Sequence, residues 1–171
     1  MEWSGFELHP ETPAGGISTA DLLRHVNLNE MHARLAARAE EYGLTIRPAK
    51  RMPNTRAALH AAEYARDHSR FDELHTLLFK AHFEDLLDIE DAAVLRRLAE
   101  QATLDPDDMM AAVADDRYRA RLDRVREEAR TLGLTGVPLF LVKRPADPGF
   151  TKLIGARPID DFRRLLGSAT L

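Results

Sequence analysis

The stretch LTGVPLFLV, residues 134–142, combines one proline with a continuous apolar run. Residues 139–142 are typical of a strand buried on both faces. Pro138 stands at the start of that strand, where the loss of a backbone donor does little harm. The next residues, KRPADPG and FTKLI, are typical of a turn and a second strand, so the pattern predicts a β-hairpin. From the residues alone a trans bond before Pro138 is the ordinary interpretation, because only about 5% of X–Pro bonds in folded proteins are cis.

Upstream of the hairpin, residues 18–132 are dominated by apolar side chains at helical spacing. The clearest case is FDELHTLLFKAHFEDLL, residues 71–87, whose apolar residues recur at steps of three and four. A first helix is predicted from an N-cap at Ser18 or Thr19 to Gly43, with a break inside it at Asn27 or Asn29. Further helix boundaries are predicted at Asn54, Asp88 or Asp91, Pro106 and Gly133. Residues 2–8 are predicted as a strand, residues 44–48 as a brief extended segment, and the residues after Pro158 as a final helix.

The order strand, helical block, strand, strand, helix predicts a single α/β (α+β) domain with a large helical insertion. The chain has 171 residues and a formal net charge of −4, with acidic and basic residues interleaved. No apolar stretch approaches the roughly 20 residues that a membrane span needs. No basic face is expected either, which argues against nucleic acid as a partner. The opening MEWSGFELHP does not resemble a secretory signal, so a cytoplasmic location is expected.

Candidate chemical groups are few. The sequence has no cysteine, which excludes disulfides, thiolate ligands and a dithiol redox cycle carried by this chain. His68, His75 and His82 are seven residues apart, which separates them by roughly 10 Å per step along a helix, too far to share one metal ion. The acidic runs DIEDAA and DPDD are interpreted as helix caps. Ser4 and Ser18 have no histidine and acid in a recognisable register, so no hydrolase site is expected.

Taken with IGARPIDDF at 154–162, the stretch TGVPLFLV resembles the C-terminal signature of the DsbA-like thioredoxin superfamily, in particular its FrnE-like branch. That branch is related to 2-hydroxychromene-2-carboxylate isomerases and kappa-class glutathione transferases. Three further segments resemble the branch in the same order: WSGFELHPETP, MPNTRAALHAAEYAR and LLFKAHFEDLLDIEDAAVLRRLA. The resemblance therefore extends over nearly the whole chain.

The resemblance implies a cis-proline loop at Gly136, Val137 and Pro138. In such a loop the residue before the proline offers its backbone N–H and C=O to an extended peptide or a small thiol ligand, of which glutathione is one. The family's first strand and first helix, with the Cys-x-x-Cys motif or the isomerase serine, precede the segment that EWSGFEL resembles. The expected fold is therefore an incomplete thioredoxin-like domain formed by residues 1–17 and 133–171, with a mainly helical insertion at 18–132 and no catalytic residue.

Two functions follow from the resemblance as expectations. The first is a DsbA-family protein that has no redox activity of its own and binds a ligand or partner near Pro138. The alternative is an N-terminally truncated disulfide oxidoreductase, or a glutathione-dependent isomerase, whose catalytic element lies upstream of Met1. Without the first strand, the strands at 2–8 and 139–142 either pair with each other or leave open edges, and we expect a homodimer to cover those edges. Arg51, Arg56 and Arg157 are candidates to line a groove, although surface solvation is their ordinary role.

Overall fold

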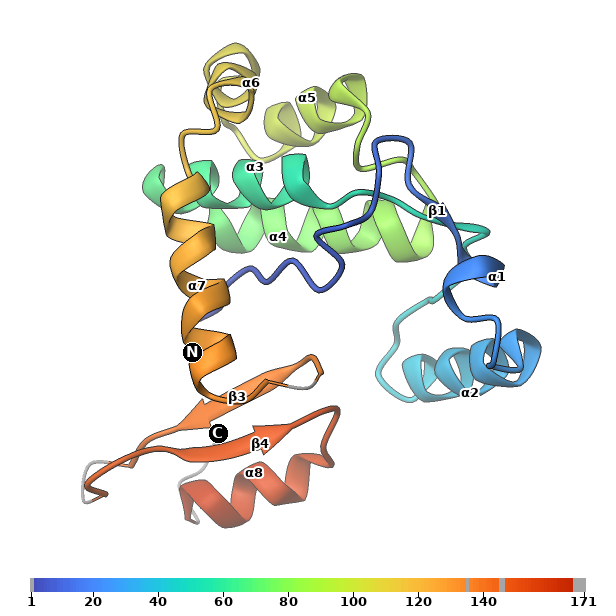
Figure 1. Cartoon of the computed structure of the whole chain (residues 1–171), viewed down its shortest axis with the longest axis vertical. Helices are drawn as coiled ribbons and strands as arrows, with labels where there is room; N and C mark the ends of the chain where they lie inside the picture. Colours follow the sequence, from blue (N-terminus) through green and yellow to red (C-terminus); the bar gives the residue numbers. More distant parts are fainter. Residues whose placement is uncertain (1, 135, 145–146, 168–171) are drawn as a thin grey trace. The chain divides into compact units, whose positions relative to one another are not determined.

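The computed structural model describes residues 2–134, 136–144 and 147–167, which form helices and four short strands (Figure 1). The chain divides into two units, Met1–Arg124 and Val125–Leu171, with helix α7 crossing the boundary. The elements of the first unit are β1 (Ile17–Ser18), α1 (Thr19–Leu22), α2 (Leu28–Glu40), β2 (Arg51–Met52), α3 (Arg56–Asp67), α4 (Phe71–Phe79), the π-helical turn η1 (Lys80–Glu84), α5 (Ala92–Gln101) and α6 (Pro106–Ala114). They are followed by α7 (Arg119–Thr131), β3 (Leu139–Val142), β4 (Thr151–Ile154) and α8 (Ile159–Leu166).

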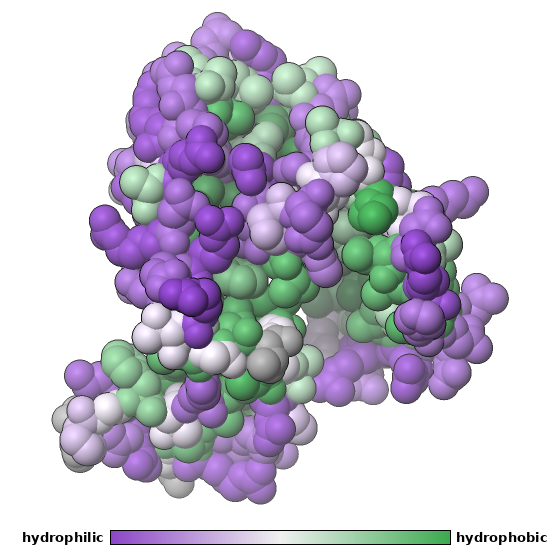
Figure 2. All heavy atoms as spheres, in the orientation of Figure 1, coloured by the Kyte–Doolittle hydropathy of each residue, from purple (hydrophilic) through white to green (hydrophobic). Residues whose placement is uncertain are grey.

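The core of the first unit lies among α3, α4, α5 and α6. Helix α3 contacts both α4 and α6, and α5 contacts both α4 and α6 (Figure 1). Small alanine side chains on α3, including the fully buried Ala61 and Ala65, let the neighbouring helices approach closely. Leu74, Leu95 and Met109 fill the space between the helices and are likewise fully buried. Hydrophilic side chains dominate the visible outer surface over α6 and the first turns of α7 (Figure 2).

One polar group is built into this core. Tyr64 is 1% exposed, and its hydroxyl donates a hydrogen bond of 2.8 Å to Asp108 Oδ2. Burial, together with the hydrogen bond to Asp108, raises the pKa of Tyr64 to about 12. The hydroxyl therefore stays a donor across the physiological pH range and ties α3 to α6.

Most helix boundaries lie at or next to the residues that the sequence singles out, and the break expected at Asn27 or Asn29 is the start of α2. Asn27 and Asp91 accept hydrogen bonds from the first backbone N–H groups of α2 and α5. Pro106 occupies the first turn of α6, where its missing N–H has no partner to lose. Asn54 stands one residue before the cap position of α3, and its side chain still accepts a 2.9 Å hydrogen bond from Arg56 N.

The helices end in a shared motif that the sequence shows only in part. After α2 and α7 the chain turns through Gly43 and Gly133, both with positive φ. After α3, α5 and α6 the same turn falls on Ser69, Thr103 and Asp116, with φ of 57°, 60° and 50°. These three residues lack the conformational freedom of glycine. No local sequence pattern predicts them as helix ends.

The N-terminal segment differs from the expectation. Residues 2–8 form no strand; they are held instead by side chains of the helical unit. Trp3 stacks on His75 with ring centroids 5.4 Å apart, and its carbonyl accepts a 2.5 Å hydrogen bond from Arg66 Nη2. At Gly5 a Cβ would stand 2.8 Å from Leu59 Cδ2, so the backbone lies directly on α3. A β-compatible sequence becomes a strand only beside a partner strand, and these residues have none among those described.

The expected extended segment at 44–48 is also displaced. The strand is β2, which pairs antiparallel with β1 through Ile17 opposite Met52 and Ser18 opposite Arg51. Gly16 makes this approach possible, because it has φ of 73° and a Cβ there would collide with the Met52 carbonyl oxygen. The pairing partner, not the apolar content of 44–48, therefore determines where the strand forms.

None of the helices in the described ranges is long and apolar enough to cross a membrane. The longest helices, α2 and α7, have 13 residues each. They are about 20 Å long at 1.5 Å per residue.

The turn after α5 generates a stability prediction. Thr103 is exposed in the left-handed region, while Leu104 N donates to Ala99 O at 2.9 Å and Thr103 N to Glu100 O at 3.0 Å. We expect Thr103→Gly to raise the free energy of unfolding by about 0.5–1 kcal/mol, because glycine adopts positive φ without a Cβ penalty. Thr76→Gly, the same change at an exposed position inside α4, should lower it. Urea unfolding of both variants measures the difference, and a loss of stability in Thr103→Gly would contradict the assignment.

A buried histidine generates a second prediction. The side chain of His60 on α3 is 2% exposed, and its Nδ1 has no hydrogen-bond partner among the described residues. Burial holds the pKa of His60 below its ordinary value, opposed by Asp116, whose Oδ1 lies 3.6 Å from Nε2. Arg56 and Arg119 act with burial, and Glu7 acts with Asp116.

Because the pKa of His60 is lower in the folded than in the unfolded chain, the unfolded state binds the proton first as the pH falls through about 6.5. We therefore expect the free energy of unfolding to fall between pH 7.5 and pH 5.5, and to fall less in His60→Phe. Urea titrations at several pH values measure both slopes. Burial also lowers the pKa of His75 and His82, so some pH dependence should remain in the variant. Equal losses in the parent and the variant would show that His60 does not carry this effect.

Candidate functional site

The predicted β-hairpin is present in the second unit. Strands β3 and β4 pair antiparallel, with Leu139 opposite Ile154, Phe140 opposite Leu153, Leu141 opposite Lys152 and Val142 opposite Thr151. The pairing brings Pro138 opposite Gly155, and Gly155 N donates a 2.8 Å hydrogen bond to Pro138 O. The hairpin therefore begins at Pro138, as the sequence predicts.

The hydrogen bond at Pro138 determines the direction of every backbone group on β3. In an antiparallel pair, residues that exchange hydrogen bonds alternate with residues that do not. Pro138, Phe140 and Val142 therefore face β4, whereas the N–H and C=O groups of Leu139 and Leu141 point to the opposite edge. Within the described ranges β3 has β4 as its sole neighbour, so that opposite edge is open.

The three candidate residues lie at the start of this open edge. Val137 is 45% exposed, Pro138 is exposed, and the bond between them is cis. The backbone N–H and C=O of Val137 have no hydrogen-bond partner in the part of the chain that the structure describes. A Cβ at Gly136 would have no atom within 4 Å, so none of the described residues obstructs the surface beside the loop.

The two faces of the hairpin differ. On one face Phe140 packs edge-on against Phe162 of α8, with ring centroids 4.8 Å apart. On the other face the side chains of Leu141 and Ile154 are 43% and 38% exposed. The open edge is therefore continuous with a face that exposes Leu141 and Ile154 together with Lys152, which lies opposite Leu141. An open edge beside exposed apolar side chains favours another extended segment.

The three arginines considered for a groove are engaged in ion pairs. Arg157 pairs with Asp161 at 2.7 Å, within the second unit. In the first unit Arg51 pairs with Glu90 at 3.4 Å, and Arg56 pairs with Glu7 at 3.3 Å. These contacts account for the three guanidinium groups without a ligand.

The three evenly spaced histidines do not form a cluster. His68 follows the end of α3, while His75 lies in α4 and His82 in η1, beyond the turn at Ser69. Among the residues that the structure describes, no group of three or more histidine, aspartate or glutamate side chains could hold a metal ion. The histidines contact aromatic rings instead, and His75 lies 5.2 Å from Phe71 between ring centroids.

The chemistry of the loop resides in its backbone. Leu139 and Leu141 offer N–H and C=O groups along one edge, which suits the backbone of an extended ligand. Val137 lies in the bend directly before that edge. The sequence supplies no cysteine thiol beside them. Leu139 and Leu141 were not among the predicted site residues. Counting alternate residues from Pro138 would have identified them once the hairpin register was known.

The chain is similar to known proteins in sequence and in fold. Residues 1–167 match the family of DSBA-like thioredoxin domains. The uncharacterized protein YwbO of Bacillus subtilis (strain 168) is 28% identical over 156 residues, which cover 87% of this chain and 74% of that protein.

A solved structure is also similar. The crystal structure of a probable DsbA oxidoreductase from Streptomyces coelicolor superposes with a TM-score of 0.79 at 26% sequence identity. The match covers 94% of this chain and 71% of that one. The family match over nearly the whole chain, together with the hairpin that starts at Pro138, shows that this chain belongs to the DSBA-like thioredoxin domain family.

Proposed function

We propose that this chain binds an extended polypeptide segment along residues 137–141 and carries out no thiol–disulfide exchange with its own side chains. The observation that supports the proposal is the outer edge of β3, where the backbone groups of Leu139 and Leu141 have no partner strand among the described residues. Val137, directly before this edge, has no backbone partner in the described ranges either. A ligand in extended conformation would add a strand beside β3 and satisfy each of these groups in turn. We also propose that the chain belongs to the FrnE-like branch of the family, because the four segments quoted in the sequence analysis resemble that branch.

The exposed face of the hairpin defines the ligand further. Alternate side chains of an added strand lie on the same face as Leu141 and Ile154, which are both more than a third exposed. Apolar residues at alternate positions of the ligand would cover this surface. The proposed ligand is therefore an extended segment with an apolar residue at every second position.

A small thiol peptide satisfies part of the same edge. The cysteinyl unit of glutathione has one backbone N–H and one C=O, which are the groups that Val137 requires of a ligand. It would reach the loop and leave Leu141 free. Glutathione is therefore proposed as a weak ligand of the loop, and a longer peptide as the stronger one.

A second copy of the chain also fits the open edge. Two β3 strands related by a two-fold axis would pair antiparallel, which uses the same groups on both copies. We propose a homodimer of this kind when no ligand is bound. Peptide and partner copy would then compete for Leu139 and Leu141.

The edge generates a specific prediction. We expect Leu141→Pro to weaken both dimerisation and peptide binding by roughly tenfold or more, because proline removes a donor on the open edge and its ring obstructs a neighbouring strand. The N–H of Leu141 does not bond to β4, so the hairpin loses no hydrogen bond of its own. Leu141→Ala is the matched control for the lost side chain.

Light scattering after gel filtration measures the dimer, and fluorescence polarisation with a labelled peptide of alternating valine and threonine measures binding. The circular dichroism spectrum of Leu141→Pro must match that of the parent, so that the loss of binding is not a loss of folding. If the parent is a monomer and does not bind the peptide, the edge is not a binding surface. If Leu141→Pro dimerises and binds as well as Leu141→Ala, the binding surface lies elsewhere.

A further prediction concerns redox chemistry. Thiol–disulfide exchange requires an attacking thiolate, and this chain has no cysteine. We therefore expect the rate of insulin reduction to equal that of the buffer blank, while calorimetric titration with glutathione gives heat at roughly millimolar concentration. Turnover above the blank would refute the absence of redox activity. The absence of heat would restrict the site to longer ligands.

A further inference from the structure

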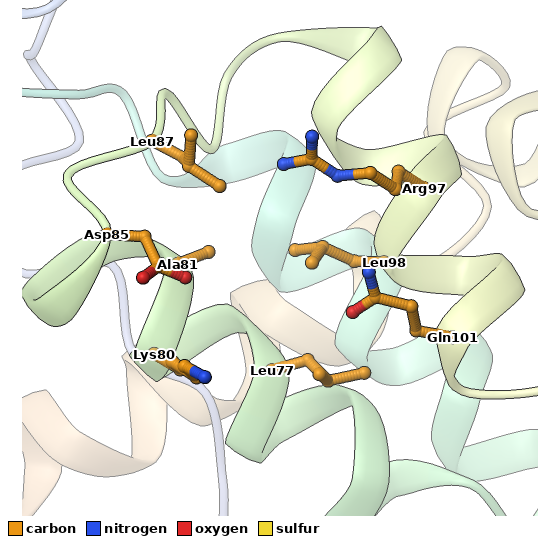
Figure 3. A pocket seen from close by; sticks show the side chains of 8 residues that line it. All are labelled: Leu77, Lys80, Ala81, Asp85, Leu87, Arg97, Leu98 and Gln101. Atoms are coloured by element: carbon orange, nitrogen blue, oxygen red, sulfur yellow. The ribbon is translucent and has the colours of Figure 1, made fainter.

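A polar pocket lies in the helical unit between the C-terminal end of α4, η1 and the second half of α5 (Figure 3). Its volume is about 320 Å³, at the lower end of the range for small-molecule sites. Apolar atoms of Leu77 and Leu98 contribute to its lining, and Leu98 is 3% exposed. The size of the pocket fits a small molecule, and its apolar lining fits an aliphatic group.

Four exposed polar side chains face the pocket without a partner among the residues that the structure describes. Lys80 and Asp85 approach from the η1 side, and Arg97 and Gln101 approach from α5 (Figure 3). None of the four side chains forms a hydrogen bond or an ion pair with any residue in the described ranges. The adjacent Arg96 differs, because it forms an ion pair with Asp107.

The charges in the pocket remain apart although they have opposite signs. Neither the Lys80 ammonium nor the Arg97 guanidinium lies within 4.0 Å of an Asp85 carboxylate oxygen. The pocket therefore holds two unneutralised cations and one unneutralised anion around an apolar floor. A ligand that carries both signs of charge would bring each of them a partner.

The π-helical turn explains why Lys80 and Asp85 share the pocket. Residues five apart in an α-helix point about 140° away from each other, since each residue turns about 100°. In η1 the Asp85 N–H donates to the Lys80 carbonyl at 3.0 Å, and this wider turn brings the two residues to one side. π-helical turns are rare and frequently occur at functional sites.

The helix itself does not account for Asp85. The C-terminal end of a helix carries partial negative charge, which favours Lys80 there and disfavours a carboxylate. Asp85 occupies the C-cap of η1, the position where its charge is least favourable. The next residue, Leu86, has a backbone φ of 55°, which is uncommon for residues other than glycine. An unfavourable charge beside a strained residue suggests a role in binding.

We propose that this pocket binds a small zwitterion, a free α-amino acid with an aliphatic side chain. Lys80, Arg97 and Gln101 would bind its carboxylate, and Asp85 would bind its ammonium group. The aliphatic side chain would lie on Leu77 and Leu98. This site is separate from the backbone edge of β3 and does not depend on the function proposed for it.

Three probes that share the leucine side chain and differ in charge test the proposal on the full chain. Leucine carries both charges, N-acetyl-leucine carries the carboxylate alone, and leucinamide carries the ammonium group alone. Titration calorimetry or amide chemical shifts should show leucine binding more tightly than N-acetyl-leucine by roughly tenfold, and leucinamide more weakly still. No binding of leucine up to about 10 mM would overturn the proposal.

Variants of exposed residues locate the binding. Arg97→Gln should weaken leucine binding by roughly tenfold, because the carboxylate loses a charged partner. Asp85→Asn should abolish the preference for leucine over N-acetyl-leucine. Arg96→Gln is the control, because it removes the neighbouring guanidinium, which pairs outside the pocket.

Thermal melts should show that all three variants are folded. If Arg96→Gln and Arg97→Gln weaken binding equally, the effect is general surface charge and the site is refuted. If Asp85→Asn retains the preference for leucine, the ammonium group is bound elsewhere and the zwitterion assignment is wrong.

Discussion

The alternation of hydrogen bonds along β3 is the constraint on which the candidate site depends. A strand presents backbone groups to both of its edges, and an antiparallel neighbour satisfies one edge alone. The bond from Gly155 N to Pro138 O fixes which residues face β4. Leu139 and Leu141 face the other way, and Val137 lies in the bend directly before them. Every chemical property proposed for the loop follows from this parity, and none depends on a reactive side chain.

The two units differ in how far each one buries its own apolar side chains and pairs its own polar groups. In the first unit the helices bury a core of alanine, leucine and tyrosine side chains, and Tyr64 has its own hydrogen-bond partner. In the second unit two strands pack on α8 through Phe140, and the opposite face keeps Leu141 and Ile154 partly exposed. Two-stranded hairpins are marginal unless a further strand or helix covers them. The second unit is thus the part of the chain that gains most from an added strand.

Much of the fold could be predicted from the sequence, because helices and hairpins leave local signals. Asn27, Pro106 and Gly133 mark helix boundaries through their own conformational preferences, and the hairpin follows from an apolar run with a turn. Residues 2–8 were predicted wrongly because strand formation requires a partner that local sequence does not reveal. The ends of helices at Ser69 and Thr103 were not predictable, since neither residue type favours positive φ.

The two sites differ in what the sequence can reveal about them. Val137 acts through backbone groups that all residues other than proline share, so its identity carries no signal, and only the resemblance to a family indicated it. The pocket acts through charged side chains, yet its residues were missed for another reason. The stretch from Phe79 to Leu86 has the spacing of an ordinary helix, and in an ordinary helix Lys80 and Asp85 would point apart. Their convergence depends on one wider turn, which the pattern of apolar residues does not encode. A charged site formed in this way becomes visible only in the backbone path.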